Sequence, residues 1–165
     1  MTNQPKRKPN RLAQYDYSSP GAFFITICTK NKKCIFWKVG ASSARPGSTT
    51  NLSKIGLTVK KKIAEIPIFY RDIKVENSVV MPNHVHLLLT HYYDDSRRAM
   101  LAPTTNISTV IQQFKGAVTK EVGFSVWQKS FHDRIIRNEK EFIKLYEYIE
   151  NNPYIWEGDS LYIKT

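Results

Sequence analysis

The sequence lacks any apolar run near the ~18 residues that a membrane-spanning helix requires. Only two of its 165 residues are cysteines, Cys28 and Cys34, too few for a disulfide framework or a cysteine-rich metal site. No Walker-type glycine loop is present, and the basic N-terminus has no apolar stretch behind it that would make a secretory signal. We therefore expect a cytoplasmic protein with two reduced thiols, no membrane span and no need for ATP.

Acidic residues are also scarce. Lysine and arginine total 25 against 14 aspartates and glutamates, which gives a formal net charge of +11. Such an excess favours a polyanionic partner, nucleic acid first and an anionic membrane surface second. A basic surface without a dedicated partner is the alternative. Apolar residues make up 41% of the chain and charged residues 24%, ordinary values for a globular protein, so full disorder is excluded.

Hydrophobic spacing predicts mixed helices and strands in a single domain. The expected elements are strands at 23–29, 69–75, 77–80, 84–90 and 126–137, and helices from Leu52 to a stop at Pro67, from Asn106, and from Asn138 to Asn151. This order predicts an α+β fold, with a ferredoxin-like or palm antiparallel sheet, helices packed on it and strand 84–90 in its centre. Residues 1–20 are expected to form a flexible basic arm, 21–156 the domain and 157–165 a C-terminal tail.

His84 and His86 are separated by one residue on a predicted strand. Side chains at i and i+2 of a strand point to the same face, so the two imidazoles stand side by side. That arrangement suits bidentate binding of a divalent metal, although two partly exposed histidines without a ligand would have the same spacing. His91 is five positions from His86 and shares no strand face with it, so we expect it to be non-catalytic.

The last predicted helix carries a tyrosine and an asparagine on one side. Its apolar stripe is expected to consist of Phe142, Leu145, Tyr146 and Ile149. Tyr148 falls at the flank of this stripe, and Asn152 lies four residues later on the same side. This edge could face the two histidines. Alternatively, Tyr148 is a surface tyrosine and Asn152 simply ends the helix before Pro153.

Three segments together resemble a known family. Residues 81–90, MPNHVHLLLT, contain a histidine–hydrophobic–histidine (HUH) motif, and residues 146–153, YEYIENNP, are similar to the Tyr-Ile-x-x-Asn-Pro motif of single-tyrosine HUH transposases. Residues 127–137, WQKSFHDRIIR, resemble the stretch before the catalytic helix in one branch. The chain is identified, over about residues 10–156, as similar to the REP-associated tyrosine transposases, relatives of the small bacterial insertion-sequence transposases.

The resemblance implies a role for each matched residue. His84 and His86 correspond to the metal-binding histidines, Tyr148 to the nucleophile, and Asn152 to a third ligand that offers its amide oxygen to Mg²⁺ or Mn²⁺. Insertion-sequence relatives commonly have glutamine at this last position. The implied activity is that of a single-stranded DNA endonuclease and strand transferase, which acts at hairpins of REP-like palindromes through a 5′-phosphotyrosine. The chain would work as a monomer or a homodimer.

Basic residues supply the candidate DNA contacts. They are Lys6, Arg7, Lys8 and Arg11 on the N-terminal arm, and Lys115 and Lys120 on the second helix. Each of them could equally be a plain solvated cation. Three rival functions remain open at this point: a domesticated hairpin-binding protein without strand transfer, a metal phosphodiesterase that uses water, and a structural nucleic-acid module.

Overall fold

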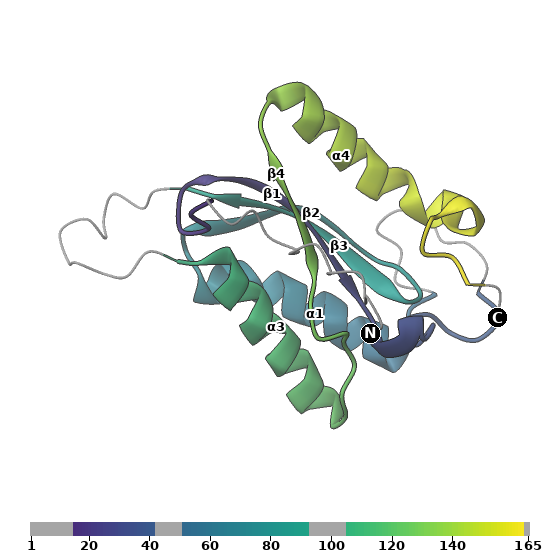
Figure 1. Ribbon diagram of the computed structural model, residues 1–165. Helices are drawn as coiled ribbons and strands as arrows, with labels where there is room; N and C mark the ends of the chain where they lie inside the picture. The colour runs from purple at the N-terminus through teal and green to yellow at the C-terminus, as the bar shows by residue number, and fades with distance from the viewer. Residues whose placement is uncertain (1–14, 42–50, 93–104, 164–165) are drawn as a thin grey trace, which may run out of the picture.

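A computed structural model describes residues 15–41, 51–92 and 105–163 of the chain (Figure 1). The elements are β1 (Gly21–Cys28), η1 (Lys30–Lys32), α1 (Lys54–Phe69), β2 (Ile73–Val80), β3 (His84–His91), α3 (Ile107–Val122), β4 (His132–Ile136), α4 (Glu139–Asn151) and η2 (Asn152–Gly158). None of the helices in these ranges combines the length and the apolar character that crossing a membrane demands.

The four strands form one antiparallel sheet in the order β2-β3-β1-β4. The predicted α+β fold with an antiparallel sheet is confirmed. Strand β3, which carries His84 and His86, pairs with β1 on one side and β2 on the other, so it is an inner strand. Its backbone groups are therefore paired along both edges, which fixes the position of both histidines.

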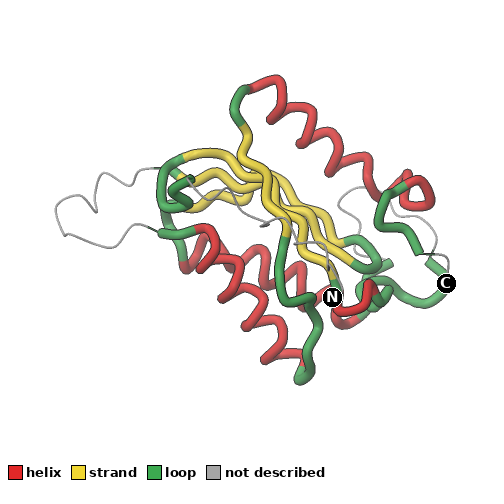
Figure 2. The backbone as a smooth tube through the Cα atoms, viewed as in Figure 1, coloured by secondary structure: helices red, strands yellow, loops and turns green. Residues whose placement is uncertain are grey.

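Helices cover both faces of the sheet. Helices α1 and α3 lie side by side on one face, and α4 crosses the other (Figures 1 and 2). Because side chains alternate along a strand, Val85 and Leu87 point into the large core under α1 and α3, whereas Leu88 packs with Ile149 of α4. His84 and His86 have the same parity as Leu88, so they face the α4 side.

Helix α1 begins where predicted but continues through its proline. The Ser53 hydroxyl caps the helix by accepting a hydrogen bond from the Gly56 amide at 3.1 Å. We predicted that Pro67 ends the helix, which is wrong, since α1 runs to Phe69 and the Tyr70 amide still bonds to the Ile66 carbonyl. A proline removes one helical hydrogen bond and crowds the carbonyl four residues earlier, but only two residues of α1 follow Pro67, and the buried Ile66 holds this last turn against the sheet.

The predicted strand at 126–137 is also partly wrong, because only His132–Ile136 joins the sheet as β4. Upstream, Trp127 packs its ring against Phe36 and Phe114, with ring centroids 5.2 and 5.7 Å away. Around Trp127 the chain forms an isolated bridge with Thr29, just past β1, and the Gln128 amide donates to the Cys28 carbonyl at 2.9 Å. Aromatic burial therefore turns the chain away from regular pairing before β4 begins.

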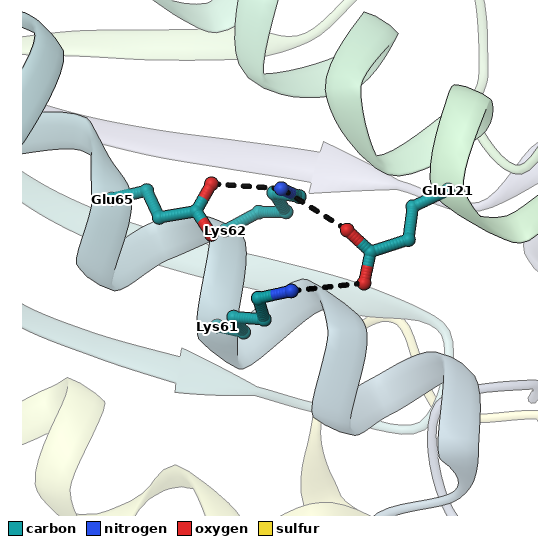
Figure 3. A network of polar contacts seen from close by, with 4 residues as sticks. All are labelled: Lys61, Lys62, Glu65 and Glu121. Carbon is teal, nitrogen blue, oxygen red and sulfur yellow. Dashed lines mark hydrogen bonds and ion pairs between the residues drawn. The ribbon is translucent and has the colours of Figure 1, made fainter.

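Ion pairs join α1 and α3 at their surface (Figure 3). Lys62 lies 2.8 Å from Glu65 and 3.1 Å from Glu121, which Lys61 also approaches at 3.4 Å. Ion pairs at a protein surface contribute little to stability, because water screens the charges. The buried apolar side chains between the two helices and the sheet therefore supply most of the stabilisation.

Candidate functional site

His84 and His86 lie side by side on the face of the sheet that α4 crosses. Their Nε2 atoms are 3.1 Å apart, and both residues are buried. Two ligands that each lie roughly 2.1 Å from one ion, at a near-right angle, are themselves separated by about 3 Å. The spacing of the two rings therefore fits a shared divalent cation.

The second ring nitrogens have partners that orient the two rings. Asn83 donates from Nδ2 to the Leu161 carbonyl at 2.9 Å, so its Oδ1 is the acceptor for Nδ1–H of His84 at 2.8 Å. This assigns the proton of His84 to Nδ1 and leaves a lone pair on Nε2. The Nδ1 atom of His86 lies 2.8 Å from the Thr26 hydroxyl. Such outer hydrogen bonds are typical of histidines that bind metals.

Burial keeps both rings uncharged. It lowers the pKa of His84 to about 3, with a smaller contribution from the positive charge of Lys32. Burial, followed by repulsion from His84, holds the pKa of His86 well below its usual value. The neutral imidazole is the form that can bind a metal.

Tyr148 of α4 approaches these histidines within the same chain. Its ring centroid lies 5.4 Å from that of His86 and 6.0 Å from that of Phe24, which in turn stacks on His86 at 5.0 Å. The predicted faces of α4 are wrong in one respect. Tyr146, which we expected to pack in the apolar stripe, is 39% exposed, whereas Tyr148 faces the sheet with the buried Ile149.

Asn152 follows α4 directly and is fully buried. Its Nδ2 donates to Oδ2 of Asp159 at 3.0 Å, and the Tyr148 hydroxyl donates to the same oxygen at 3.3 Å. A carboxylate only accepts hydrogen bonds, so Nδ2 is the amide atom that faces Asp159. The other amide atom, Oδ1, is buried without a hydrogen-bond partner among the described residues. A buried carbonyl oxygen left in this state is a natural ligand for a hard cation.

The environment of Tyr148 keeps its phenol protonated. Burial raises the pKa of Tyr148 to about 12, and the charge and hydrogen bond of Asp159 act in the same direction. In this arrangement the hydroxyl is a weak nucleophile at neutral pH. Activation therefore requires a compensating positive charge, either nearby or on the substrate.

Asp159 was absent from the predicted site. One carboxylate oxygen of Asp159 and one ring nitrogen each of His84 and His86 lie within 4.8 Å of one another. Sequence reasoning placed Asp159 in the C-terminal tail, because a lone aspartate after the asparagine–proline pair carries no periodicity or spacing signal. Only the fold of η2 and the turn that follows brings it to the histidines.

A cleft of about 340 Å³ opens beside Tyr148. Phe24, Thr26 and His86 form its floor on the sheet, and Lys144 and His132 line it further. His132 and Lys144 are exposed. A cleft with an aromatic floor and basic groups on its walls suits a phosphate flanked by unstacked bases.

Two of the predicted DNA contacts, Lys115 and Lys120, lie away from this cleft. Lys115 donates to the backbone carbonyls of Gln128 at 2.7 Å and Lys129 at 3.1 Å, and burial lowers its pKa. Lys120 is exposed. Both lysines belong to α3, on the face of the sheet opposite α4, so the structure does not bring them to Tyr148. Lys6, Arg7, Lys8 and Arg11 lie outside the described residues.

The third histidine of β3 has a separate environment. His91 is buried, with Nε2 3.4 Å from Asp72 and Nδ1 3.2 Å from the Ser19 carbonyl. It is at the far end of the strand from His84 and has the opposite parity. Its contacts give it a structural role in holding the chain before β1 and the start of β2.

Comparisons with known proteins find similarity to a curated relative and to solved structures, two of which are described here. An uncharacterised protein of Haemophilus influenzae is 33% identical over 175 residues, which cover 95% of this chain and 93% of the relative. The structure of a REP-associated tyrosine transposase bound to a REP hairpin matches with a TM-score of 0.59 at 21% identity, over 81% of this chain and 67% of that chain. A proposed transposase of Deinococcus radiodurans matches at a TM-score of 0.49 and 17% identity, over 86% and 95%, which is too weak to support an inference. No protein-family profile matches the chain.

Proposed function

We propose a function from the premise that the chain belongs to one family with the Haemophilus influenzae protein and has, as its motifs predicted, the fold of a REP-associated tyrosine transposase. We propose that this chain is a metal-dependent enzyme that cuts and rejoins single-stranded DNA at hairpins, with Tyr148 as nucleophile. The observation that carries this proposal is the contact between the Tyr148 ring and His86, beside a buried pair of imidazoles.

The donor set fits a divalent cation. Nε2 of His84, Nε2 of His86 and the unpartnered Oδ1 of Asn152 would hold Mg²⁺ or Mn²⁺, as nitrogen and amide oxygen atoms can. When bound, such an ion withdraws charge from a phosphate and orients it. Asn83 and Thr26 keep the two rings in the orientation that this binding requires.

Tyr148 performs the covalent step. Its oxygen attacks phosphorus, a bond forms between them, and the bond from phosphorus to the 3′-oxygen breaks, so the phenol loses a proton and the 3′-oxygen gains one. The product is a 5′-phosphotyrosine, in which the phosphoester bond is conserved until a second 3′-hydroxyl attacks phosphorus and releases the tyrosine. Phe24 packs against both His86 and Tyr148, which limits the positions that the phenol can take.

Hairpin DNA is the proposed substrate. The net charge of +11 favours a polyanion, and the cleft beside Tyr148 has room for an unpaired nucleotide. The structure with a TM-score of 0.59 is described as bound to a REP hairpin. We propose that the basic arm, Lys6, Arg7, Lys8 and Arg11, contacts phosphates, and that Lys120 adds to this outside the cleft. Lys115 is a weaker candidate because its cation already binds two carbonyls.

A labelled hairpin oligonucleotide tests the proposal. We expect incubation with Mn²⁺ or Mg²⁺ to give a protein–DNA adduct that survives denaturing electrophoresis, and Tyr148→Phe to abolish it. Tyr146→Phe, which changes an exposed phenol two residues away, is the matched control and retains the adduct. Cleavage that persists in Tyr148→Phe would establish a water-using phosphodiesterase instead. Hairpin binding without cleavage would establish a domesticated DNA-binding protein.

A further inference from the structure

We propose that Asp159 is a protein ligand of the divalent cation, so that the segment Asn152–Tyr162 closes the metal site opposite β3. The inference rests on the proposed function, because the cation is the one assigned above to His84 and His86. It adds a carboxylate to a set of ligands that the sequence motifs limited to two imidazoles and one amide.

Distances place Asp159 within reach of such an ion. Its carboxylate oxygen and the ring nitrogens of His84 and His86 are all within 4.8 Å of one another. Two ligands on opposite sides of one ion, each roughly 2.1 Å from it, lie about 4.2 Å apart. The limit of 4.8 Å is close to this separation, so the three atoms are near enough to share one ion.

The backbone around Asp159 directs its carboxylate toward the site. One oxygen, Oδ1, accepts a hydrogen bond from the Leu161 amide at 2.6 Å. The Asp159 amide donates to the Trp156 carbonyl at 3.0 Å, which fixes the turn. The other oxygen, Oδ2, accepts from the Tyr148 hydroxyl and from Nδ2 of Asn152, and the Tyr148 ring in turn contacts His86.

The same segment contacts His84 directly and through a neighbour. The Trp156 ring lies 6.0 Å from the His84 ring and packs on Tyr162 at 5.2 Å. Asn83 joins the Nδ1 atom of His84 to the Leu161 carbonyl. Residues on both sides of Asp159 are therefore anchored to the same histidine, so the carboxylate is held in place before any ion binds.

Charge balance gives an independent reason for a carboxylate. His84, His86 and Asn152 are neutral ligands, and all three are buried. A dication among neutral buried groups carries a large desolvation penalty unless an anion lies close by. Among the described residues, Asp159 is the acidic group that joins the two histidines in a potential metal cluster.

Manganese binding tests the inference without measuring catalysis. We would titrate Mn²⁺ into the full chain and follow free Mn²⁺ by electron paramagnetic resonance and heat by calorimetry. Asp159→Asn retains an oxygen that can accept from the Leu161 amide, but its new amide nitrogen cannot accept from Nδ2 of Asn152, so circular dichroism and urea denaturation check that the fold is intact. We expect it to weaken Mn²⁺ binding by about 10-fold or more. Glu157→Gln, an exposed charge in the same segment, should leave the affinity unchanged.

Cadmium distinguishes a ligand from a nearby charge. In a chain with Cys28→Ala and Cys34→Ala, the further change Asp159→Cys should give an ultraviolet thiolate-to-cadmium charge-transfer band on addition of Cd²⁺. Absence of the band, or an unchanged Mn²⁺ affinity in Asp159→Asn, overturns the inference. If His86→Ala then still abolishes Mn²⁺ binding, the proposed metal site stands without Asp159. If the wild-type chain binds no Mn²⁺, both proposals fail.

Discussion

The rings of His86 and Tyr148 meet edge to face within one chain, with centroids 5.4 Å apart and planes at 63°. The residue from the inner strand and the residue from α4 therefore need no second copy of the chain to come together. The sequence left open whether the tyrosine serves its own histidines or those of a partner. The geometry favours action within one chain.

Mixing two inactive variants tests this arrangement. We expect Tyr148→Phe and His86→Ala each to abolish adduct formation with a hairpin, and an equimolar mixture of the two to stay inactive. The physical reason is that every complete site requires both residues from the same chain. Activity recovered in the mixture would show that subunits exchange the α4 helix. A mixture of Tyr148→Phe with wild type is the control, because it shows whether an inactive chain inhibits an active one.

Asn83 should control metal affinity without touching the metal. In Asn83→Ala the Nδ1–H of His84 loses its acceptor and Leu161 loses its donor, so the lone pair on Nε2 is no longer oriented. Losses of such outer partners cost about 10–100-fold in metal affinity. Calorimetric titration with Mn²⁺ measures the change. Asn77→Ala, which changes a half-buried asparagine on β2 that bonds to Glu150, is the matched control.

Two glycines should respond in opposite directions to alanine. A Cβ at Gly56 would lie 2.1 Å from the Phe36 carbonyl oxygen, a backbone atom that cannot move aside. We expect Gly56→Ala to lower the free energy of unfolding by about 1–3 kcal/mol or more. At Gly116, in α3, a Cβ meets nothing within 4 Å, and alanine should raise the free energy by roughly 0.5–1 kcal/mol. Urea denaturation measures both changes, and equal effects would refute the close contact at Phe36.

Acid should destabilise the metal-free protein through its buried histidines. The folded-state pKa of His84 is about 3 against an ordinary value of 6.5, and that of His86 is also well below 6.5. Between the folded-state and unfolded-state pKa values, the unfolded chain takes up protons that the folded chain does not bind. The contribution of the two rings to the free energy of unfolding is therefore fully present above pH 6.5, and it is lost as the pH falls below that value. The loss approaches about 1.4 kcal/mol per pH unit for each ring. Urea denaturation with a chelator at pH 7 and pH 5 measures it.

A variant with both rings replaced provides the comparison. In His84→Gln with His86→Gln, neither position titrates, so the additional loss of stability between pH 7 and pH 5 should largely disappear. An identical pH dependence in wild type and variant would mean that the two rings take up protons in the folded state. The free energies of unfolding at pH 7 set the baseline for each protein.

Sequence reasoning identified most elements because their signals are local. The apolar run in residues 84–90 predicted the strand that is β3, and Asn138 does cap α4, accepting from the Glu141 amide at 2.9 Å. It failed at Pro67 and at residues 126–131, where burial of Ile66 and Trp127 overrides the local preference. Tyr146 was assigned to the wrong face because the two tyrosines of α4 are equally apolar, and helical periodicity alone does not reveal which side of α4 meets the sheet.

The sequence by itself determined that two imidazoles share one strand face and that a tyrosine and an asparagine share one helix edge, because both facts follow from the repeat of a single element. Only the tertiary structure decided that α4 lays Tyr148 against His86, that the amide oxygen of Asn152 is buried with no hydrogen-bond partner in the described part of the chain, and that Asp159 approaches the two histidines. Those relationships join segments far apart in the chain. They depend on how the sheet, α4 and η2 pack together, which no local pattern records.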